Sequence, residues 1–304
     1  MTTASRVPNN ARQRLLLMLL SALGGRVNKL DFQKLLFLWC QQKGSSVPYE
    51  FVPYKFGAFS FTSYADLRKL AERGLLQNEE RHWVLLENTS AGQDTRSVTS
   101  TLETFVREYR DFRGDPLIAE TYRRFPYYAT RSTIAEQVLH GDKGGLAKIE
   151  SARPDPRAPG IVTIGYEGHT LEHYLNHLIL NGVTILCDVR RNAISRKYGF
   201  SKSTLSTACE GVGLRYTHLP ELGIASEKRQ SLNSQADYDA LFEAYEREHL
   251  PGQSDTIASI HAWVRDGARV ALTCYEHLPS RCHRHCVAEA LEQTFGTGFA
   301  AQHL

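Results

Sequence analysis

The chain has 304 residues, a formal net charge of +3 and 42% hydrophobic residues. This composition excludes disordered and fibrous chains, and the length allows two domains with separate cores. So small a net charge does not by itself require a nucleic-acid partner. The longest apolar run, Leu15 to Leu20, is too short for a membrane span, and the N-terminus has no basic-then-apolar export signal. We therefore expect a cytoplasmic protein without membrane contact.

The cysteine content also favours a reducing compartment. Six cysteines are scattered through a long chain, which is untypical of a disulfide framework. They are Cys40, Cys187, Cys209, Cys274, Cys282 and Cys286.

Residues 1–90 predict three helices and a β-hairpin, the order of a winged helix. Apolar spacing and capping residues give helices over 12–23, 28–40 and 64–73, and two apolar runs between Leu75 and Leu86 give the hairpin. A winged helix places its third helix in a nucleic-acid groove, where Arg68 and Lys69 would contact phosphates. The same residues equally fit a solvated helix face. The segments KLDFQKLLFLWCQQ and YKFGAFS resemble the antitoxin-type Panacea domain, which implies partner binding or regulation as readily as DNA binding.

Residues 91–158 predict a helical connector that ends in a proline-rich linker. Residues 87–101 are typical of a loop, and helical periodicity returns over 102–112. The segment YRRFPYYATRS, residues 122–132, interleaves arginines and aromatics as a single-strand-binding segment does, but a packed aromatic linker is favoured. Pro154, Pro156 and Pro159 mark the boundary to the next domain.

Residues 159–304 predict an α/β domain. Strands are expected over 161–166, 184–189, 216–219 and 269–275, with helices over 171–180, 201–210, 237–249, 256–265 and 283–295. This alternation indicates a mainly parallel sheet flanked by helices. Ligands of such sheets bind beyond the carboxyl ends of the strands.

Polar residues follow all four predicted strands. An acidic residue directly after a strand as apolar as TILC or LTCY favours a functional site over a solvated rim. The candidate catalytic residues at these ends are Tyr166, Glu167, Asp188, His218, Glu221, Cys274 and Glu276.

Four segments resemble domain-of-unknown-function family 488 across the whole C-terminal half. They are TIGYEG (163–168), DVRRNAISRKYGFSK (188–202), HLPELG (218–223) and CYEHLPSRCHR (274–284). One departure is Ala193, which stands where the family has proline. The resemblance implies that the motif residues line a shared site, and it implies no particular reaction.

Several carboxylates around one pocket suit acid/base chemistry. We expect Asp188 or Glu276 to activate water or stabilise a sugar cation, and Tyr166 and His218 to contact a leaving base. Each carboxylate alternatively forms a structural ion pair with a neighbouring arginine.

Basic residues beside the predicted pocket suit phosphate. Those expected to contact DNA are Arg190, Arg191, Arg196, Lys197, Tyr198 and Lys202 in one loop, and Cys282, His283 and Arg284 at a helix start.

The cysteines and histidine near the C-terminus leave several interpretations open. Cys274, Cys282, His283 and Cys286 have an irregular spacing for zinc, so we assign no metal and no cofactor. A reactive thiolate at Cys274 or Cys282 is an alternative, and inert buried cysteines are the default.

Together these features predict an enzyme that acts on DNA, most simply a glycosylase that excises a flipped base from modified or foreign phage DNA. If cleavage used a covalent imine, Lys197 or Lys202 would supply the amine. The alternatives are a cysteine- or metal-dependent enzyme on a nucleotide or small molecule, and a non-catalytic regulator that binds DNA or a partner protein. The sequence indicates no oligomeric state.

Overall fold

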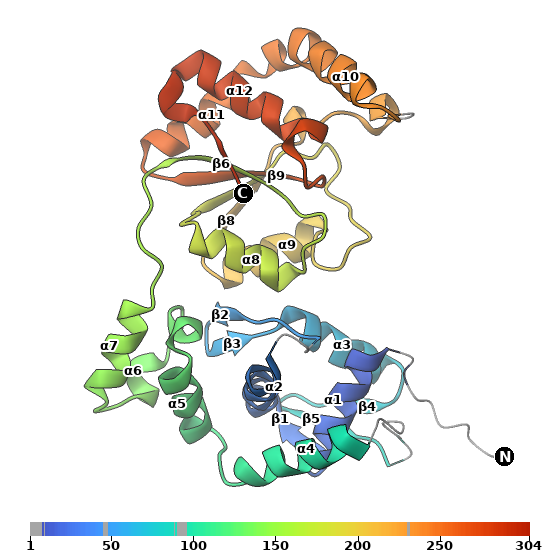
Figure 1. Cartoon of the computed structure of the whole chain (residues 1–304), viewed down its shortest axis with the longest axis vertical. Helices are drawn as coiled ribbons and strands as arrows, with labels where there is room; N and C mark the ends of the chain where they lie inside the picture. The colour runs from blue at the N-terminus through green and yellow to red at the C-terminus, as the bar shows by residue number, and fades with distance from the viewer. Residues whose placement is uncertain (1–7, 9, 45–47, 88, 90–95, 230–231) are drawn as a thin grey trace, which may run out of the picture. The chain divides into compact units, whose positions relative to one another are not determined.

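The computed structural model describes residues 8, 10–44, 48–87, 89, 96–229 and 232–304 (Figure 1). The chain divides into two compact units, Met1–Arg153 and Pro154–Leu304. The sequence placed the boundary at 158–159, slightly later. The proline-rich segment lies with the second unit because Arg269 Nη1 donates to the Ala158 carbonyl oxygen at 3.1 Å.

The first part of the N-terminal unit contains three helices and two small antiparallel sheets. Asn28 begins the second helix by accepting a hydrogen bond from the Leu30 amide at 2.9 Å. One sheet has the strand order β1-β5-β4, and the other is a β2-β3 hairpin that the sequence did not predict. The elements are α1 (Ala11–Ala22), β1 (Arg26–Asn28), α2 (Lys29–Lys43), β2 (Val52–Tyr54), β3 (Gly57–Phe59), α3 (Phe61–Glu72), β4 (Leu76–Asn78) and β5 (His82–Leu85). Arg68 and Lys69 are exposed on α3, and DNA binding by this unit stays a prediction.

The predicted connector packs into the same unit. Its helices are α4 (Arg96–Glu108), α5 (Asp115–Arg124), α6 (Ala135–Val138) and α7 (Lys143–Ser151), and α4 starts earlier than the periodicity indicated. Residues 88 and 90–95 of the predicted loop lie outside the described residues. Phe105 of α4 joins the core formed by α1 and α2. Tyr122 is buried, and Phe125 and Tyr128 pack on the Phe37 ring, so the aromatic segment is structural.

The C-terminal unit is built on a five-stranded parallel sheet, which confirms the predicted fold class. The strand order is β10-β6-β9-β7-β8. The strands are β6 (Gly160–Gly165), β7 (Ile185–Asp188), β8 (Arg215–His218), β9 (Arg269–Cys274) and the short edge strand β10 (Gln302–His303), which the sequence did not predict. β6, β7 and β9 are almost wholly buried because helices cover both faces of the sheet.

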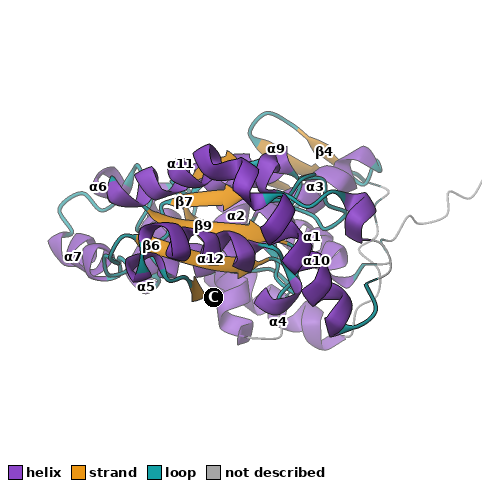
Figure 2. Ribbon diagram, turned by 90° about the horizontal axis from the view of Figure 1, so that it is seen from above, coloured by secondary structure: helices purple, strands orange, loops and turns teal. Residues whose placement is uncertain are grey.

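Helices α8 and α9 lie on one face of this sheet, and α11 and α12 lie on the other (Figure 1). Figure 2, which looks from above, shows α11 and α12 crossing in front of the strands. The helices of this unit, including α10, are α8 (Leu171–Leu180), α9 (Lys202–Gly211), α10 (Gln235–Glu248), α11 (Ser254–Arg265) and α12 (Arg284–Phe295). β9 lies between β6 and β7 in the sheet. β6 leads into α8 and β7 leads into α9 on one face, whereas β9 leads into α12 on the other face. Such a reversal opens a crevice at the carboxyl ends of the strands, where ligands of open α/β sheets bind.

Candidate functional site

The carboxyl ends of β6, β9 and β7 bring the central motifs together. Gly165 of β6 is in register with Cys274 of β9, and Asp188 of β7 is in register with Thr273. Tyr166, Asp188 and Cys274 therefore come from neighbouring strand ends, as the sequence predicted.

Asp188 is fully buried and is held by an arginine from its own motif. Arg190 donates to its two carboxylate oxygens from Nε at 2.8 Å and from Nη2 at 2.5 Å. The Tyr216 hydroxyl donates to Oδ2 at 2.6 Å. The arginine itself is 5% exposed. This geometry is that of a buried structural ion pair, the alternative to catalysis that the sequence left open.

Buried Tyr166 and half-buried His218 both contact Arg190. Arg190 Nη1 donates to the Tyr166 hydroxyl at 2.8 Å, and the Tyr166 ring stacks on Phe200 with centroids 4.4 Å apart. His218 Nε2 contacts the Arg190 carbonyl oxygen at 2.8 Å. These contacts support the turn after β7 and leave Tyr166 buried, so it does not present a donor to the solvent side.

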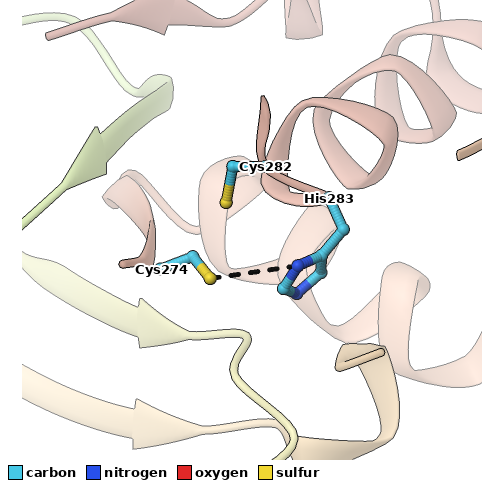
Figure 3. A group of neighbouring side chains, drawn as sticks. All are labelled: Cys274, Cys282 and His283. Atoms are coloured by element: carbon cyan, nitrogen blue, oxygen red, sulfur yellow. Dashed lines mark hydrogen bonds between the residues drawn. The ribbon is translucent and has the colours of Figure 1, made fainter. Parts of the chain in front are cut away.

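A second buried cluster lies at the end of β9 and the start of α12 (Figure 3). It consists of Cys274, Cys282 and His283, whose ligand atoms all lie within 4.8 Å of one another. Cys274 Sγ is 3.9 Å from His283 Nδ1, and His283 Nε2 is 2.9 Å from the Val189 carbonyl oxygen. Each of the three residues is at most 3% exposed. The cluster is therefore a compact set of two thiols and one imidazole.

The thiols of this cluster differ in acidity. Burial works against a thiolate at Cys282, but hydrogen bonds from Cys274 and His283 lower its pKa well below the usual value. The pKa of Cys274 is raised because it donates its hydrogen to Cys282 and is buried. Burial would lower the pKa of His283, but its hydrogen bond to Cys282 raises it. Without a bound ion the cluster thus favours a thiolate at Cys282.

Glu276 lies beside this cluster, at the wall of a pocket. Its carboxylate oxygen is 3.5 Å from Cys274 Sγ, and burial together with the nearby Cys282 raises its pKa to about 7. The pocket has a volume of about 440 Å³, in the usual range for small-molecule sites. Arg229 Nη1 lies 3.9 Å from the Glu276 carboxylate. The other lining residues that matter here are Asn233, Tyr238, Arg281, Cys282 and His283.

Residues 170–291 match the family described as Domain of unknown function DUF488. The C-terminal unit belongs to the DUF488 family. No curated protein and no solved structure matches the chain. The predicted family is therefore confirmed for this half of the chain.

Arg284 of the DUF488 domain has a structural role in place of the predicted phosphate contact. Its side chain is fully buried, and its guanidinium donates to the carbonyl oxygens of Glu276 and His277. It thereby fixes the turn after β9 that carries Glu276. Gly165 permits this arrangement, because a Cβ there would lie 1.8 Å from the Glu276 carbonyl oxygen.

The predicted basic loop of the DUF488 domain is largely on the surface. Arg191, Arg196 and Lys202 are exposed, while Lys197 is half-buried and donates to the Tyr166 carbonyl oxygen at 3.0 Å. Tyr198 is 39% exposed.

Two other predicted carboxylates lie outside the pocket lining. Glu167 is exposed and accepts a hydrogen bond from the His277 amide at 2.9 Å. Glu221 is exposed, and its carbonyl oxygen is 2.6 Å from His249 Nε2. The structure thus places Glu276, Cys282 and His283 of the predicted set in the pocket lining with Cys274 next to them, and it places Asp188 and Tyr166 in a buried network outside the pocket lining.

The sequence did not single out Arg229, Asn233, Tyr238 or Arg281, which line the pocket. They come from the segment after β8, the start of α10 and the turn before α12, and no motif connects them. Arg281 lies in the segment CYEHLPSRCHR, so the family resemblance was the one signal that pointed to its surroundings.

Proposed function

We propose that the C-terminal unit is a hydrolytic enzyme that acts on a nucleobase or nucleotide, with Glu276 as its acid/base group. The observation that carries this proposal is the position of the Glu276 carboxylate, which lies at the wall of a 440 Å³ pocket between Arg229 and the Cys274 thiol. A carboxylate in such a position can take a proton from an attacking water.

The pocket lining supports a substrate with an aromatic ring and an anionic group. Arg229 and Arg281 provide guanidinium groups of the kind that bind phosphate. Arg281 lies over the Tyr238 ring at 5.9 Å, and Phe242 adds a further aromatic surface. Aromatic side chains of this kind stack on bases.

Excision of a base from modified or foreign DNA is the reaction to test first. Water oxygen bonds to C1′ of the sugar, the bond from C1′ to the base nitrogen breaks, and the base nitrogen takes its electron pair and a proton. Glu276 receives the proton that the water loses and gives it up again to solvent, from which the base nitrogen takes its proton. The exposed Arg191, Arg196 and Lys202 support contact with the DNA backbone. Activity on phage-type modified DNA would give the protein a role in defence.

The test is incubation of the full chain with unmodified and phage-type modified DNA, and separately with nucleotides, followed by alkali treatment and product analysis. We expect release of a base that Glu276→Gln reduces at least about 100-fold. The matched control is Glu210→Gln, an exposed glutamate on α9, which should retain activity. No product from any substrate, or full activity of Glu276→Gln, would refute the proposal.

A second candidate is a cysteine-dependent reaction at Cys282. This residue lines the same pocket, next to His283, which is the N-cap of α12. A covalent adduct at Cys282 in mass spectra, together with activity that survives in Glu276→Gln, would favour it over hydrolysis by water.

A further inference from the structure

The buried cluster next to the pocket has the composition of a metal site. Cys274, Cys282 and His283 offer two sulfur atoms and one nitrogen atom. Zinc sites of enzymes use three protein ligands of this kind and leave the fourth position to water or substrate.

The distances in the cluster fit one tetrahedral ion. Zinc bonds of about 2.3 Å to sulfur and about 2.0 Å to nitrogen place neighbouring ligand atoms roughly 3.5–3.8 Å apart. Cys274 Sγ and His283 Nδ1 are 3.9 Å apart, and all three ligand atoms lie within 4.8 Å of one another. A single ion can therefore contact all three atoms after side-chain adjustments of less than 1 Å.

The histidine is oriented as a ligand. Its Nε2 atom is 2.9 Å from the Val189 carbonyl oxygen, which can only accept a hydrogen bond. Nε2 therefore carries the hydrogen, and Nδ1 faces the cysteines (Figure 3). A backbone carbonyl that accepts from the non-ligating nitrogen is a recurrent second contact of zinc-bound histidines.

The cluster has support on one side and an opening on the other. Cys274 is fixed by its position in the central strand β9, and Cys282 is held by a hydrogen bond from its amide to the Pro279 carbonyl oxygen at 2.9 Å. Cys282 and His283 also line the pocket that contains Glu276. An ion held by the three residues would therefore lie next to the space in which a substrate would bind.

We propose that Cys274, Cys282 and His283 bind one zinc ion. The metal assignment goes beyond the sequence, in which the gap between Cys274 and Cys282 looked irregular for zinc. The gap is accommodated because the chain leaves β9, turns through residues 275–281 and returns at the start of α12.

The ion would also supply the attacking water, and this role rests on the proposed hydrolytic function. Zinc held by the three residues would make a bound water more acidic, and Glu276, whose carboxylate is 3.5 Å from Cys274 Sγ, would lie close enough to accept a proton from it. Zinc-dependent nucleobase deaminases combine the same components, namely three Cys or His ligands and a glutamate that is not a ligand. Metal binding itself is independent of the reaction.

The test is metal analysis of the full chain, purified under reducing conditions and dialysed against excess zinc and then against metal-free buffer. We expect about one zinc ion per chain. Replacement of the zinc by Co²⁺ should give two spectral features: the intense visible bands of a tetrahedral ion, and thiolate-to-cobalt charge-transfer absorption. Fewer than about 0.1 ions per chain, or a cobalt spectrum without charge transfer, would overturn the proposal.

Variants locate the ion. Cys282→Ser should lower zinc content at least about tenfold, and any cobalt that still binds should show about half of the charge-transfer absorption per bound ion, because one of two thiolates remains. Cys209→Ser, a matched buried cysteine of α9, should keep the full zinc content. Cys286→Ser tests the neighbouring group Glu246, His285 and Cys286, and loss of zinc in this variant but not in Cys282→Ser would overturn the assignment.

The wild-type spectrum decides the case even if a cysteine variant fails to fold. A disulfide between Cys274 and Cys282 that persists in reductant, with no metal bound, would also refute the site. Bound zinc with no activity on any substrate would refute the proposed function and leave the metal site standing.

Discussion

Replacement of Asp188 tests whether this carboxylate is structural. In Asp188→Asn the amide nitrogen must replace one of two oxygens: Oδ1, which accepts from Arg190 Nε at 2.8 Å, or Oδ2, which accepts from Arg190 Nη2 at 2.5 Å and from the Tyr216 hydroxyl at 2.6 Å. The Arg190 side chain, which is 5% exposed, would keep its positive charge without the negative charge of Asp188 beside it. Loss of one partner of a buried pair costs about 3–5 kcal/mol. We therefore expect Asp188→Asn to destabilise the C-terminal unit by about that amount.

Two measurements test this expectation: urea unfolding, monitored by tryptophan fluorescence, and thermal melting. A loss of about 3–5 kcal/mol corresponds to a fall in Tm of roughly 6–20 °C for a unit of this size. Asp266→Asn, an exposed residue at the end of α11, should change stability by less than about 0.5 kcal/mol. If Asp188→Asn stayed within about 1 kcal/mol of wild type and abolished activity, Asp188 would be catalytic and the structural interpretation wrong.

Three further predictions concern other parts of the chain. Lys34 is buried, donates to the Ala58 carbonyl oxygen and has its pKa lowered by burial to about 7 from 10.5, so the unfolded chain holds this proton to higher pH than the folded chain. Stability should therefore rise by about 2–3 kcal/mol between pH 7 and pH 9, and urea titrations should show that Lys34→Met lacks this rise; equal pH dependence in both proteins would contradict it. Gly165→Ala should cost at least about 2 kcal/mol in thermal or urea unfolding because of the Glu276 carbonyl contact, whereas Gly160→Ala on the same strand, whose nearest contact is 3.7 Å, should be nearly neutral. Charge reversal of Arg196 and Lys202 should weaken DNA binding in fluorescence anisotropy and reduce the slope of log K against log salt concentration by up to about 2. Arg265→Glu, at an exposed position on α11, should change neither; an unchanged slope in the loop variant would show that the loop does not contact DNA.

The parallel sheet was predictable because its central strands are continuous apolar runs between helical segments. Ile161 to Tyr166 and Arg269 to Tyr275 were expected as strands and form β6 and β9 within one residue. The edge strand Gln302–His303 has only two residues, too few to show any periodicity.

The roles of the site residues were less predictable than their positions. The sequence places Asp188 after a buried strand, but it does not show that Arg190, two residues later, folds back onto that carboxylate. It also places Cys274, Cys282 and His283 in one motif, but their mutual distances depend on the turn between β9 and α12. Arg229 is the last residue of a short 3-10 helix and Asn233 comes just before α10, and no local sequence pattern shows that these two residues line the pocket.

The central position of β9 also has a consequence for biosynthesis. β6 and β7 each pair with β9 and not with one another, although β9 is made about 80 residues after β7. A nascent chain that has emerged only as far as Gly267 therefore has two apolar strands without their shared neighbour. The central strand is in place only when Arg269–Cys274 has emerged, and the same segment brings Cys274 to the buried cluster and Glu276 to the pocket wall. A chain that ends before this strand would have a C-terminal unit with neither a finished core nor a site.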